Sequence, residues 1–443
     1  MPLRVQRWNE EYFDGELSSE CLELLAPLEE EHPDVLQFVE WECQAMQELG
    51  ISARDFSWLM AWELSHILPK IHPRAWDGMV PPITLKDRHW KLDDYVGRNR
   101  WHRPEAGANI VDLGCGFPPH TTVDTALAFP DCQVVGADPS FGKYFVVDQL
   151  GDYAVFEDEE KVRYFQAGIV DTARWESLTR DPEATKARFR SLLGKALADY
   201  PEARGTSLFR IEVDGMALTA NPILEYASAN LNFAQAGFDE LELEGPADVI
   251  RCMNVMIYFD HATRVRVLGR ANELLRDGGL FLAGLNWALS IYCRYAIHQK
   301  NGDSMVPREF AFGVESARPL ELVPLYRLHE DDQNCRALME CVRLLRQDPE
   351  FMAEFDPIMD ALQEENAFCP RGEDGYLRGV DPDTPPEHLQ EGFRNMVQEL
   401  DHRGLSERAA ESLRRTGLDS WRNEVGHVAV DPSGLEAFTK VAS

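Results

Sequence analysis

The sequence predicts an α/β fold, a doubly wound, Rossmann-like and mostly parallel sheet with helical N-terminal and C-terminal additions. The first observation is a set of short apolar runs separated by helix-like segments, because buried strands that alternate with helices form parallel sheets. The second is apolar residues three and four positions apart in the first hundred residues, as in amphipathic helices. The predicted strands are residues 108–113, 132–137, 247–250 and 279–285, with a further one at 426–430.

We expect three consecutive regions, because 443 residues exceed one ordinary hydrophobic core. They are an N-terminal helical region at 1–104, the Rossmann-like core at 105–330, and a mostly helical C-terminal region at 331–443. The core is longer than its strands and helices require, so it carries an insertion at about 141–222. Residues 181–200 of this insertion read as a charged helix, and we expect the insertion to form a lid or a docking surface.

The composition excludes several classes of function. The formal net charge is −32, which repels nucleic-acid phosphates and anionic lipids, so we expect no nucleic-acid and no membrane partner. The nine cysteines include no Cys-x-x-Cys pair, which favours a reducing, cytoplasmic location without disulfides. No apolar segment has the length of a signal core or a membrane span.

A glycine-rich loop follows the first predicted strand, in the sequence Ile-Val-Asp-Leu-Gly-Cys-Gly at 110–116. Gly114 and Gly116 permit a tight turn and a close approach to a ligand, and ligands bind at the carboxyl ends of parallel strands. The third glycine of the dinucleotide fingerprint is missing, and Pro118 and Pro119 stand near its place. Proline has no N–H to donate, so a pyrophosphate is disfavoured.

The second predicted strand ends at Asp138, which lies 26 residues after Asp112. An acidic residue at this place accepts hydrogen bonds from the ribose hydroxyls of a nucleoside. We expect Thr121 or Thr122 to cap the helix between the two strands, with Asp124 in its first turn.

The loop and the acid together resemble class I S-adenosylmethionine-dependent methyltransferases. Asp112, Gly114 and Gly116 stand in the segment that resembles the first motif of that family, and Asp138 resembles its ribose-binding acid. In that family the first-motif loop contacts the methionine part of the cofactor. The resemblance therefore implies that the cofactor is S-adenosyl-L-methionine.

Residues 231–241 resemble the third strand of the family and the loop that contacts adenine. Many relatives have Asp where this chain has Gly237, so Asp239 or backbone atoms would hold the adenine amino group. Phe238 either covers the adenine ring or belongs to the core.

Residues 248–260 resemble the fourth motif of the chemotaxis-receptor glutamate methyltransferases, typically Cys-Arg-Asn-Val-Leu/Met-Ile-Tyr-Phe. Asn254 and Tyr258 match this motif, whereas Met253 replaces its arginine. Asn254 ends the strand and would contact the cofactor or the acceptor, while Tyr258 either reaches the same pocket or packs the following helix. The resemblance covers residues 108–290 and leaves both terminal regions without a counterpart.

Other polar residues complete the candidate site. Arg100 belongs to a basic cluster at 98–103 and either holds the cofactor carboxylate or forms surface salt bridges. Tyr258 and His261 are the candidate catalytic residues, as general bases for an oxygen or nitrogen acceptor. The histidines show no metal-ligand spacing, so we expect no metal.

These observations predict an enzyme, a methyltransferase that moves the methyl group of S-adenosylmethionine to an oxygen or nitrogen atom of a small-molecule acceptor. Two alternatives remain. One is a protein carboxyl (glutamate) methyltransferase of the chemotaxis type, although the acidic surface would repel a glutamate-rich target. The other is a catalytically inactive, S-adenosylmethionine-binding regulatory protein. The identity of the acceptor and the oligomeric state stay open.

Overall fold

The computed structural model describes residues 3–13, 15–71, 84–168, 172–205, 207–287, 291–380 and 384–439. The chain divides into two compact units. Unit 1 contains Met1–Pro69, Asp87–Pro104 and Leu243–Ser443, and unit 2 contains Lys70–Lys86 and Glu105–Glu242. The two units therefore interleave along the chain, whereas the sequence predicts three consecutive regions.

Unit 2 contains the first predicted strands as a parallel group. Strand β1 (Asn109–Leu113) pairs in parallel with β2 (Gln133–Ala137), and β2 pairs in parallel with β8 (Leu231–Ala234). Helix α8 (His120–Ala128) connects β1 to β2, which is the predicted strand–helix–strand order. The α/β character of the fold is confirmed here.

The expected cap of α8 is wrong. The N-cap residue is Pro119, which offers no capping side chain, and the hydroxyl oxygen of Thr84 accepts from the first amide of the helix, that of His120, at 3.1 Å. Thr121 and Thr122 lie inside the helix, and Asp124 falls outside its first turn. The hydroxyl of Thr122 donates instead to the carboxylate of Asp112, 2.6 Å away, because both groups are buried and need partners.

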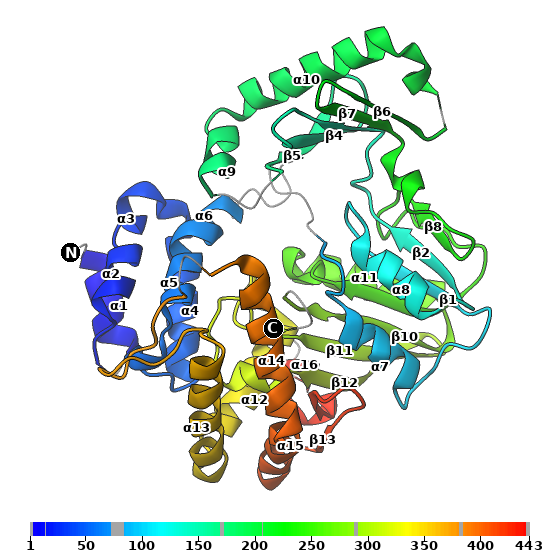
Figure 1. Ribbon diagram of the computed structural model, residues 1–443. Helices are drawn as coiled ribbons and strands as arrows, with labels where there is room; N and C mark the ends of the chain where they lie inside the picture. Colours follow the sequence, from blue (N-terminus) through cyan, green and yellow to red (C-terminus); the bar gives the residue numbers. More distant parts are fainter. Residues whose placement is uncertain are drawn as a thin grey trace. The chain divides into compact units, whose positions relative to one another are not determined.

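The insertion in unit 2 is an antiparallel sheet covered by a helix, whereas the sequence indicates only the helix, at 181–200 (Figure 1). Its strand order is β5-β4-β3-β7-β6, and α10 (Pro182–Asp199) packs along it through Phe189 and Leu193. The turn between β6 and β7 is Asp214-Gly215, with φ angles of 51° and 75°. Asp-Gly between two apolar runs is a hairpin signal, so these two strands were detectable in the sequence. The elements are β3 (Tyr144–Val147), β4 (Tyr153–Phe156), β5 (Val162–Gln166), α9 (Thr172–Thr179), η4 (Pro201–Arg204), β6 (Phe209–Val213), β7 (Met216–Ala220) and η5 (Pro222–Glu225).

Unit 1 contains the remaining predicted strands. Strand β9 (Ala247–Met253) pairs in parallel with β10 (Leu275–Leu285), and α11 (His261–Leu274) connects them. Beyond β10 the pairing becomes antiparallel, in the order β10-β11-β12-β14-β13, and β11 and β12 were not predicted. The predicted strand at 426–430 is β14. The added strands are β11 (Arg294–Asn301), β12 (Ser304–Phe312), β13 (Ser420–Arg422) and β14 (Val428–Val430).

The helices of the two chain ends share one hydrophobic core with β10, β11 and β12 (Figure 1). Cys43 from the N-terminal helices, Phe310 from β12 and Phe355 from the C-terminal helices are members of this cluster. The described N-terminal helices are α1 (Leu3–Tyr12), α2 (Ser19–Leu25), α3 (Leu28–Glu31), η1 (Pro33–Val35), α4 (Leu36–Glu48), η2 (Ala53–Asp55), α5 (Trp58–Trp62), the π-helix η3 (Glu63–Ile67), α6 (Leu68–Ile71) and α7 (Trp90–Arg98). Those that follow β9 are η6 (Met256–Tyr258), η8 (Val314–Ala317), α12 (Gln333–Arg346), α13 (Pro349–Glu365), α14 (Pro386–His402), α15 (Leu405–Arg415), η9 (Pro432–Gly434) and α16 (Glu436–Thr439).

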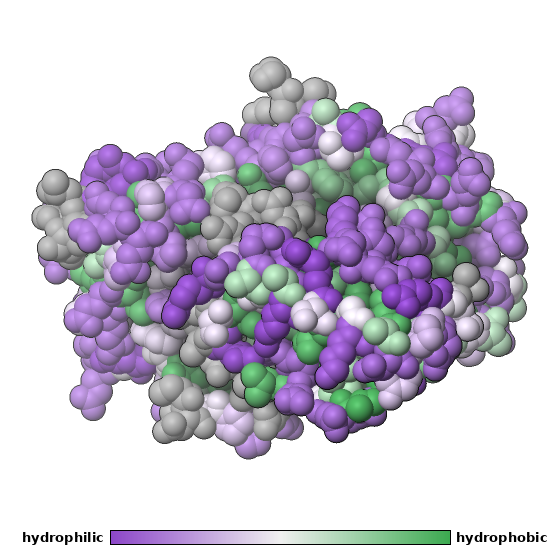
Figure 2. Space-filling view, turned by 90° about the horizontal axis from the view of Figure 1, so that it is seen from above, coloured by the Kyte–Doolittle hydropathy of each residue, from purple (hydrophilic) through white to green (hydrophobic). Residues whose placement is uncertain are grey.

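The face in Figure 2 is mainly hydrophilic, and its apolar residues form small separate groups. Within the described ranges we find no helix with the length and apolarity that a bilayer crossing requires.

Candidate functional site

The glycine loop of unit 2 is fastened to the end of β2. Gly114 and Gly116 have φ angles of 72° and 66°, in the left-handed region that favours glycine. The amide of Gly114 donates to the carbonyl of Ala137 at 2.8 Å, and the amide of Gly116 donates to Oδ2 of Asp138 at 2.8 Å. The fold therefore brings the two predicted glycines and the predicted acid together.

Asp138 is only 2% exposed, and both its carboxylate oxygens accept hydrogen bonds. Oδ1 accepts from the amide of Ser140 at 2.7 Å and also from its hydroxyl, while Oδ2 accepts from Gly116. These bonds fix the orientation of the carboxylate. A ribose diol would approach an acceptor that is already oriented, which lowers the entropy cost of binding.

Asp112, near the end of β1, supports the same loop. It is 3% exposed, and the hydrogen bond that it accepts from Thr122 connects the end of β1 to the first turn of α8. A buried carboxylate needs such partners, since burial without them is costly. Asp112 therefore stabilises the loop, and its predicted contact with a cofactor stays a prediction.

Aromatic rings pack beside the loop, and sequence reasoning missed two of them. Phe141 and Phe233 make an edge-to-face contact with ring centres 5.8 Å apart. A β-carbon at Gly136 would lie 2.8 Å from the Phe233 ring, so that ring packs directly on β2. The position of Phe141, three residues after Asp138, is the sequence feature that could have indicated it.

The predicted adenine loop is only half-buried. The amide of Gly237 donates to Oε2 of Glu240 at 3.4 Å, and its carbonyl accepts from the amides of Glu240 and Leu241. Phe238 is partly buried. The roles of Gly237 and Phe238 toward adenine stay predictions.

Unit 1 holds the other predicted cofactor residue, Asn254, at the carboxyl end of β9. Its φ is 61°, a conformation that asparagine tolerates better than most residues. Its side chain exchanges two hydrogen bonds with Asn286 at the end of β10, at 2.9 and 3.1 Å. The side-chain amide of Asn286 donates to the backbone carbonyl of Arg88. The guanidinium of Arg88 donates in turn to the backbone carbonyl of Asn286 at 2.9 Å. This polar group lies at the edge of the sheet where ligands bind in parallel α/β folds.

Asn286 and Arg88 were missed in the sequence. Asn286 directly follows the apolar run 279–285, so the same strand-end signal that identified Asn254 was present. Arg88 lies far from both in the chain and is identified only by the folded structure.

The two predicted catalytic residues lie in different surroundings. Burial raises the pKa of Tyr258, and the charge of Arg88 lowers it in part, so the phenol stays protonated at neutral pH. Tyr258 is therefore better suited to donate a hydrogen bond than to act as a base. The side chain of His261 is 57% exposed at the start of α11, and its Nδ1 lies 3.9 Å from Asp331.

Arg100 stacks on aromatic rings of unit 1. The guanidinium carbon lies 3.8 Å from the ring centre of Trp421 and 4.6 Å from that of Trp101. In the same basic cluster, Arg98 pairs with Asp94 at 2.9 Å. A contact of Arg100 with a cofactor carboxylate would have to compete with this cation–π stacking.

Comparisons with known proteins agree with the sequence motifs. Residues 221–298 match the family model of the CheR methyltransferase, SAM binding domain. The chemotaxis protein methyltransferase of Klebsiella aerogenes is 56% identical over 45 residues, 10% of this chain and 16% of that protein. Chemotaxis protein methyltransferase 2 of Pseudomonas aeruginosa is 44% identical over 62 residues, 14% of this chain and 20% of that protein. The matches thus span a fifth or less of these relatives.

A solved structure, PKMT2 from Rickettsia typhi in complex with AdoHcy, is also similar, with a TM-score of 0.23 and 16% identity over 46% of this chain and 26% of that one. This likeness is too weak to carry an argument. The sequence matches are the informative ones, and they confirm the resemblance that residues 248–260 carry.

Proposed function

We propose that the chain is an S-adenosylmethionine-dependent methyltransferase whose acceptor is a carboxyl group of a protein. The observation that carries this proposal is the match of residues 221–298 to the CheR model, which includes Asn254 and Tyr258. The named relatives are chemotaxis protein methyltransferases. They favour the protein carboxyl alternative over the small-molecule acceptor that the sequence first suggested.

The loop geometry in unit 2 supports the choice of cofactor. Two glycines in the left-handed conformation leave backbone room for a ligand beside Asp138, an oriented acceptor for ribose hydroxyls. Pro118 and Pro119 cannot donate to a diphosphate. A nucleoside without phosphates, such as S-adenosylmethionine, fits these features better than a dinucleotide.

A carboxylate acceptor also agrees with the groups of unit 1. A carboxylate is ionised at neutral pH, so its transfer reaction requires no general base, and the raised pKa of Tyr258 is no obstacle. Burial lowers the pKa of Arg88 to about 10, which keeps it charged at neutral pH close to Tyr258. This local positive charge favours an anionic acceptor although the whole chain is acidic.

The chemistry then depends on alignment. The bound cofactor supplies an activated methyl group on a sulfonium centre. The protein must hold the acceptor oxygen in line with the carbon–sulfur bond and exclude water, which is the main contribution of an enzyme to such a transfer. Asn254, Tyr258 and Arg88 are the groups of unit 1 that we propose for holding the acceptor.

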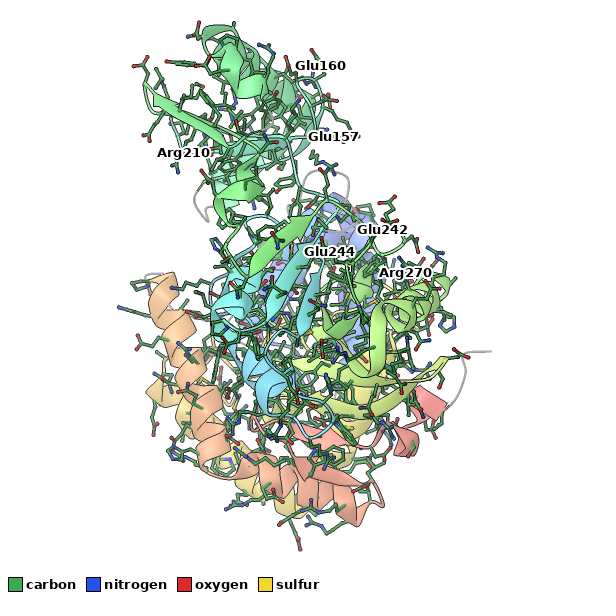
Figure 3. All side chains as sticks on the ribbon, turned by 90° about the vertical axis from the view of Figure 1, so that its right-hand side faces the viewer. Glu157, Glu160, Arg210, Glu242, Glu244 and Arg270 are labelled. Atoms are coloured by element: carbon green, nitrogen blue, oxygen red, sulfur yellow. The ribbon has the colours of Figure 1, made fainter. Side chains whose placement is uncertain are left out.

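Charges on the insertion bear on docking of a protein acceptor. Figure 3 shows Glu157 and Glu160 on one side of the inserted sheet and Arg210 on the other. Arg210 lies on β6 and pairs with Glu225 at 3.6 Å. Glu157 pairs with Lys161 and lies 3.6 Å from Arg163, so both sides of the inserted sheet carry paired charges that a protein partner could contact.

The test has two stages. Calorimetric titration of the full chain with S-adenosylmethionine and its demethylated product measures cofactor binding, and absence of binding at millimolar cofactor refutes the proposal. Asp138→Asn should weaken binding about tenfold or more, since a hydrogen bond to a charged group contributes about 1.5–3 kcal/mol. The exposed Asp131→Asn is the matched control in the same unit and should bind as wild type.

The second stage identifies the acceptor. Transfer of a tritiated methyl group into extracts should label a protein fraction, and mild alkali should release the label as methanol, because carboxyl esters hydrolyse under these conditions. Alkali-stable label, or label in a small-molecule fraction only, contradicts the carboxyl acceptor. Cofactor binding without transfer into any fraction favours the inactive regulatory alternative.

A further inference from the structure

One face of strands β10 and β11 in unit 1 contains a hollow. Residues two apart along a strand share a face, and directly paired residues of neighbouring strands share it too. The central pair on this face consists of two alanines, Ala283 and Ala296, with larger pairs on either side. The flanking pairs are Phe281–His298 and Leu285–Arg294. The short alanine side chains therefore leave space between two larger pairs.

Two helices border this hollow. Arg264 and Leu268 of α11 line it, as does the beginning of α12 with Asp332, Gln333 and Asn334. The cavity volume is about 60 Å³. A single water needs roughly 10–15 Å³ on such a measure, so the space accommodates several waters or one small ligand.

The buried cation Arg294 borders the hollow. Arg294 is fully buried, and its terminal nitrogens donate to the carbonyls of Val323, Pro324 and Tyr326. Among the described residues its Nε has no hydrogen-bond partner, and its guanidinium forms no salt bridge with a carboxylate. The acid that acts on it electrostatically is the buried Glu42, whose pKa burial raises well above the ordinary carboxyl range. The raised pKa favours the protonated form of Glu42, which balances the guanidinium less than a carboxylate would.

His298 and the helix α12 add further attraction for an anion. His298 is 8% exposed, its Nδ1 has no partner, and burial lowers its pKa to about 4, so the ring is neutral at pH 7. The first amides of α12 have no acceptor inside the helix, and the helix dipole is positive at this end.

Opposing charges in the hollow are few. The carboxylate of Asp332 lines it but caps α12 by accepting from the amide of Cys335 at 2.8 Å. Arg264 pairs with Asp331. The charge of Arg264 is balanced by Asp331, and Asp332 partly offsets that of Arg294, so the attraction for an anion rests on the unpartnered Nε of Arg294 and on the start of α12.

We propose that this hollow is a binding site for a small oxyanion, and that a short-chain carboxylate is its best-fitting ligand. The carboxylate group would lie toward Arg294 and the start of α12, while Leu268, Phe281 and Leu285 would contact the short apolar tail. The site uses none of the residues proposed above for the cofactor or the acceptor. Its occupancy would compensate a buried charge, so the ligand should stabilise unit 1 in the absence of cofactor.

The test compares anions on the full chain without cofactor. Acetate, propionate and sulfate are titrated at constant ionic strength with chloride as the reference, by calorimetry and by thermal melting. Saturable binding and a rise in melting temperature beyond the chloride value are expected, with propionate tighter than sulfate. Sulfate binding tighter than both carboxylates contradicts the short-chain carboxylate and assigns an inorganic oxyanion, whereas no effect beyond chloride overturns the site.

A matched pair of variants localises the binding. Ala296→Val fills the hollow and should weaken binding at least tenfold. Ala311→Val is the control, because Ala311 is equally buried but pairs with Tyr295, which faces the opposite side of β11. Equal binding by both variants contradicts the proposal. If Ala296→Val fails to fold, Arg264→Gln gives a second reading, because it removes a positive charge at the hollow and should also weaken binding.

Discussion

Replacing Thr122 by valine tests the anchor beneath the glycine loop. Thr122 is fully buried, and its hydroxyl donates at 2.6 Å to the carboxylate of Asp112, which is 3% exposed. Valine has nearly the same shape but no hydroxyl, so the substitution removes the hydrogen bond with little change in packing. A hydrogen bond to a charged group contributes about 1.5–3 kcal/mol, and we expect a loss of about 2 kcal/mol in the stability of unit 2.

Hydrogen–deuterium exchange of peptides that cover α8 measures this loss, because protection of a helix reports its opening free energy even when two units unfold separately. A loss of about 2 kcal/mol corresponds to exchange about thirtyfold faster. The affinity for S-adenosylmethionine should fall as well, since the same bond fixes the start of the loop.

The chain provides a matched control on the same helix. Thr125 is 2% exposed, and its hydroxyl donates to the backbone carbonyl of Thr121 at 2.9 Å, a bond between neutral groups. Such a bond contributes about 0.5–1.5 kcal/mol, so Thr125→Val should have a clearly smaller effect and leave the affinity unchanged. Equal effects of the two substitutions would refute the reasoning that the bond to Asp112 supports the loop.

Two further predictions concern the insertion and the core. Gly215 has a φ of 75° in the β6–β7 hairpin, so Gly215→Ala should destabilise unit 2 by about 1–2 kcal/mol in urea unfolding. Gly194 lies inside α10 with no atom within 4 Å of a new β-carbon, so Gly194→Ala should instead stabilise unit 2 by about 1 kcal/mol. Similar effects of the two substitutions would argue against a left-handed turn at Gly215. In the core of unit 1, Glu63 accepts a hydrogen bond from the amide of Leu322 and lies near the buried Glu321, and burial raises its pKa. Just above the ordinary carboxyl pKa, the folded state therefore keeps a proton on Glu63 that the unfolded state has lost. Stability should therefore fall as the pH rises above the ordinary carboxyl range, and Glu63→Gln should flatten this part of the profile of unfolding free energy against pH; an unchanged slope would show that Glu63 is not responsible.

The strands that sequence analysis identified share one property. Strands β1, β2, β9 and β10 are mostly buried, and each contains a short apolar run that is visible without knowledge of its neighbours. The motif residues stand at the ends of these runs. For this reason the local pattern alone is enough to identify Gly114, Asp138 and Asn254.

The antiparallel strands were not identified in the sequence because apolar and charged residues are mixed in them. In strand β6, Phe209 and Ile211 alternate with charged residues. The strand also follows shortly after α10, whose helical pattern dominates this part of the sequence. Strand β11 begins with an arginine, and strand β12 contains the fully buried Glu309. Whether such a charged residue is buried depends on partners distant in the chain, such as Trp101 and Asn423, which donate to Glu309.

The glycine loop, the acid that ends β2 and the asparagine segment after β9 can be recognised in the sequence alone, because each is a local pattern at a strand end. Tertiary structure alone decided which groups surround them. Asn286 and Arg88 meet Asn254 because the chain returns to the same sheet edge from distant positions. The two chain ends join one core because their helices carry apolar faces that pack against one another and against β10, β11 and β12.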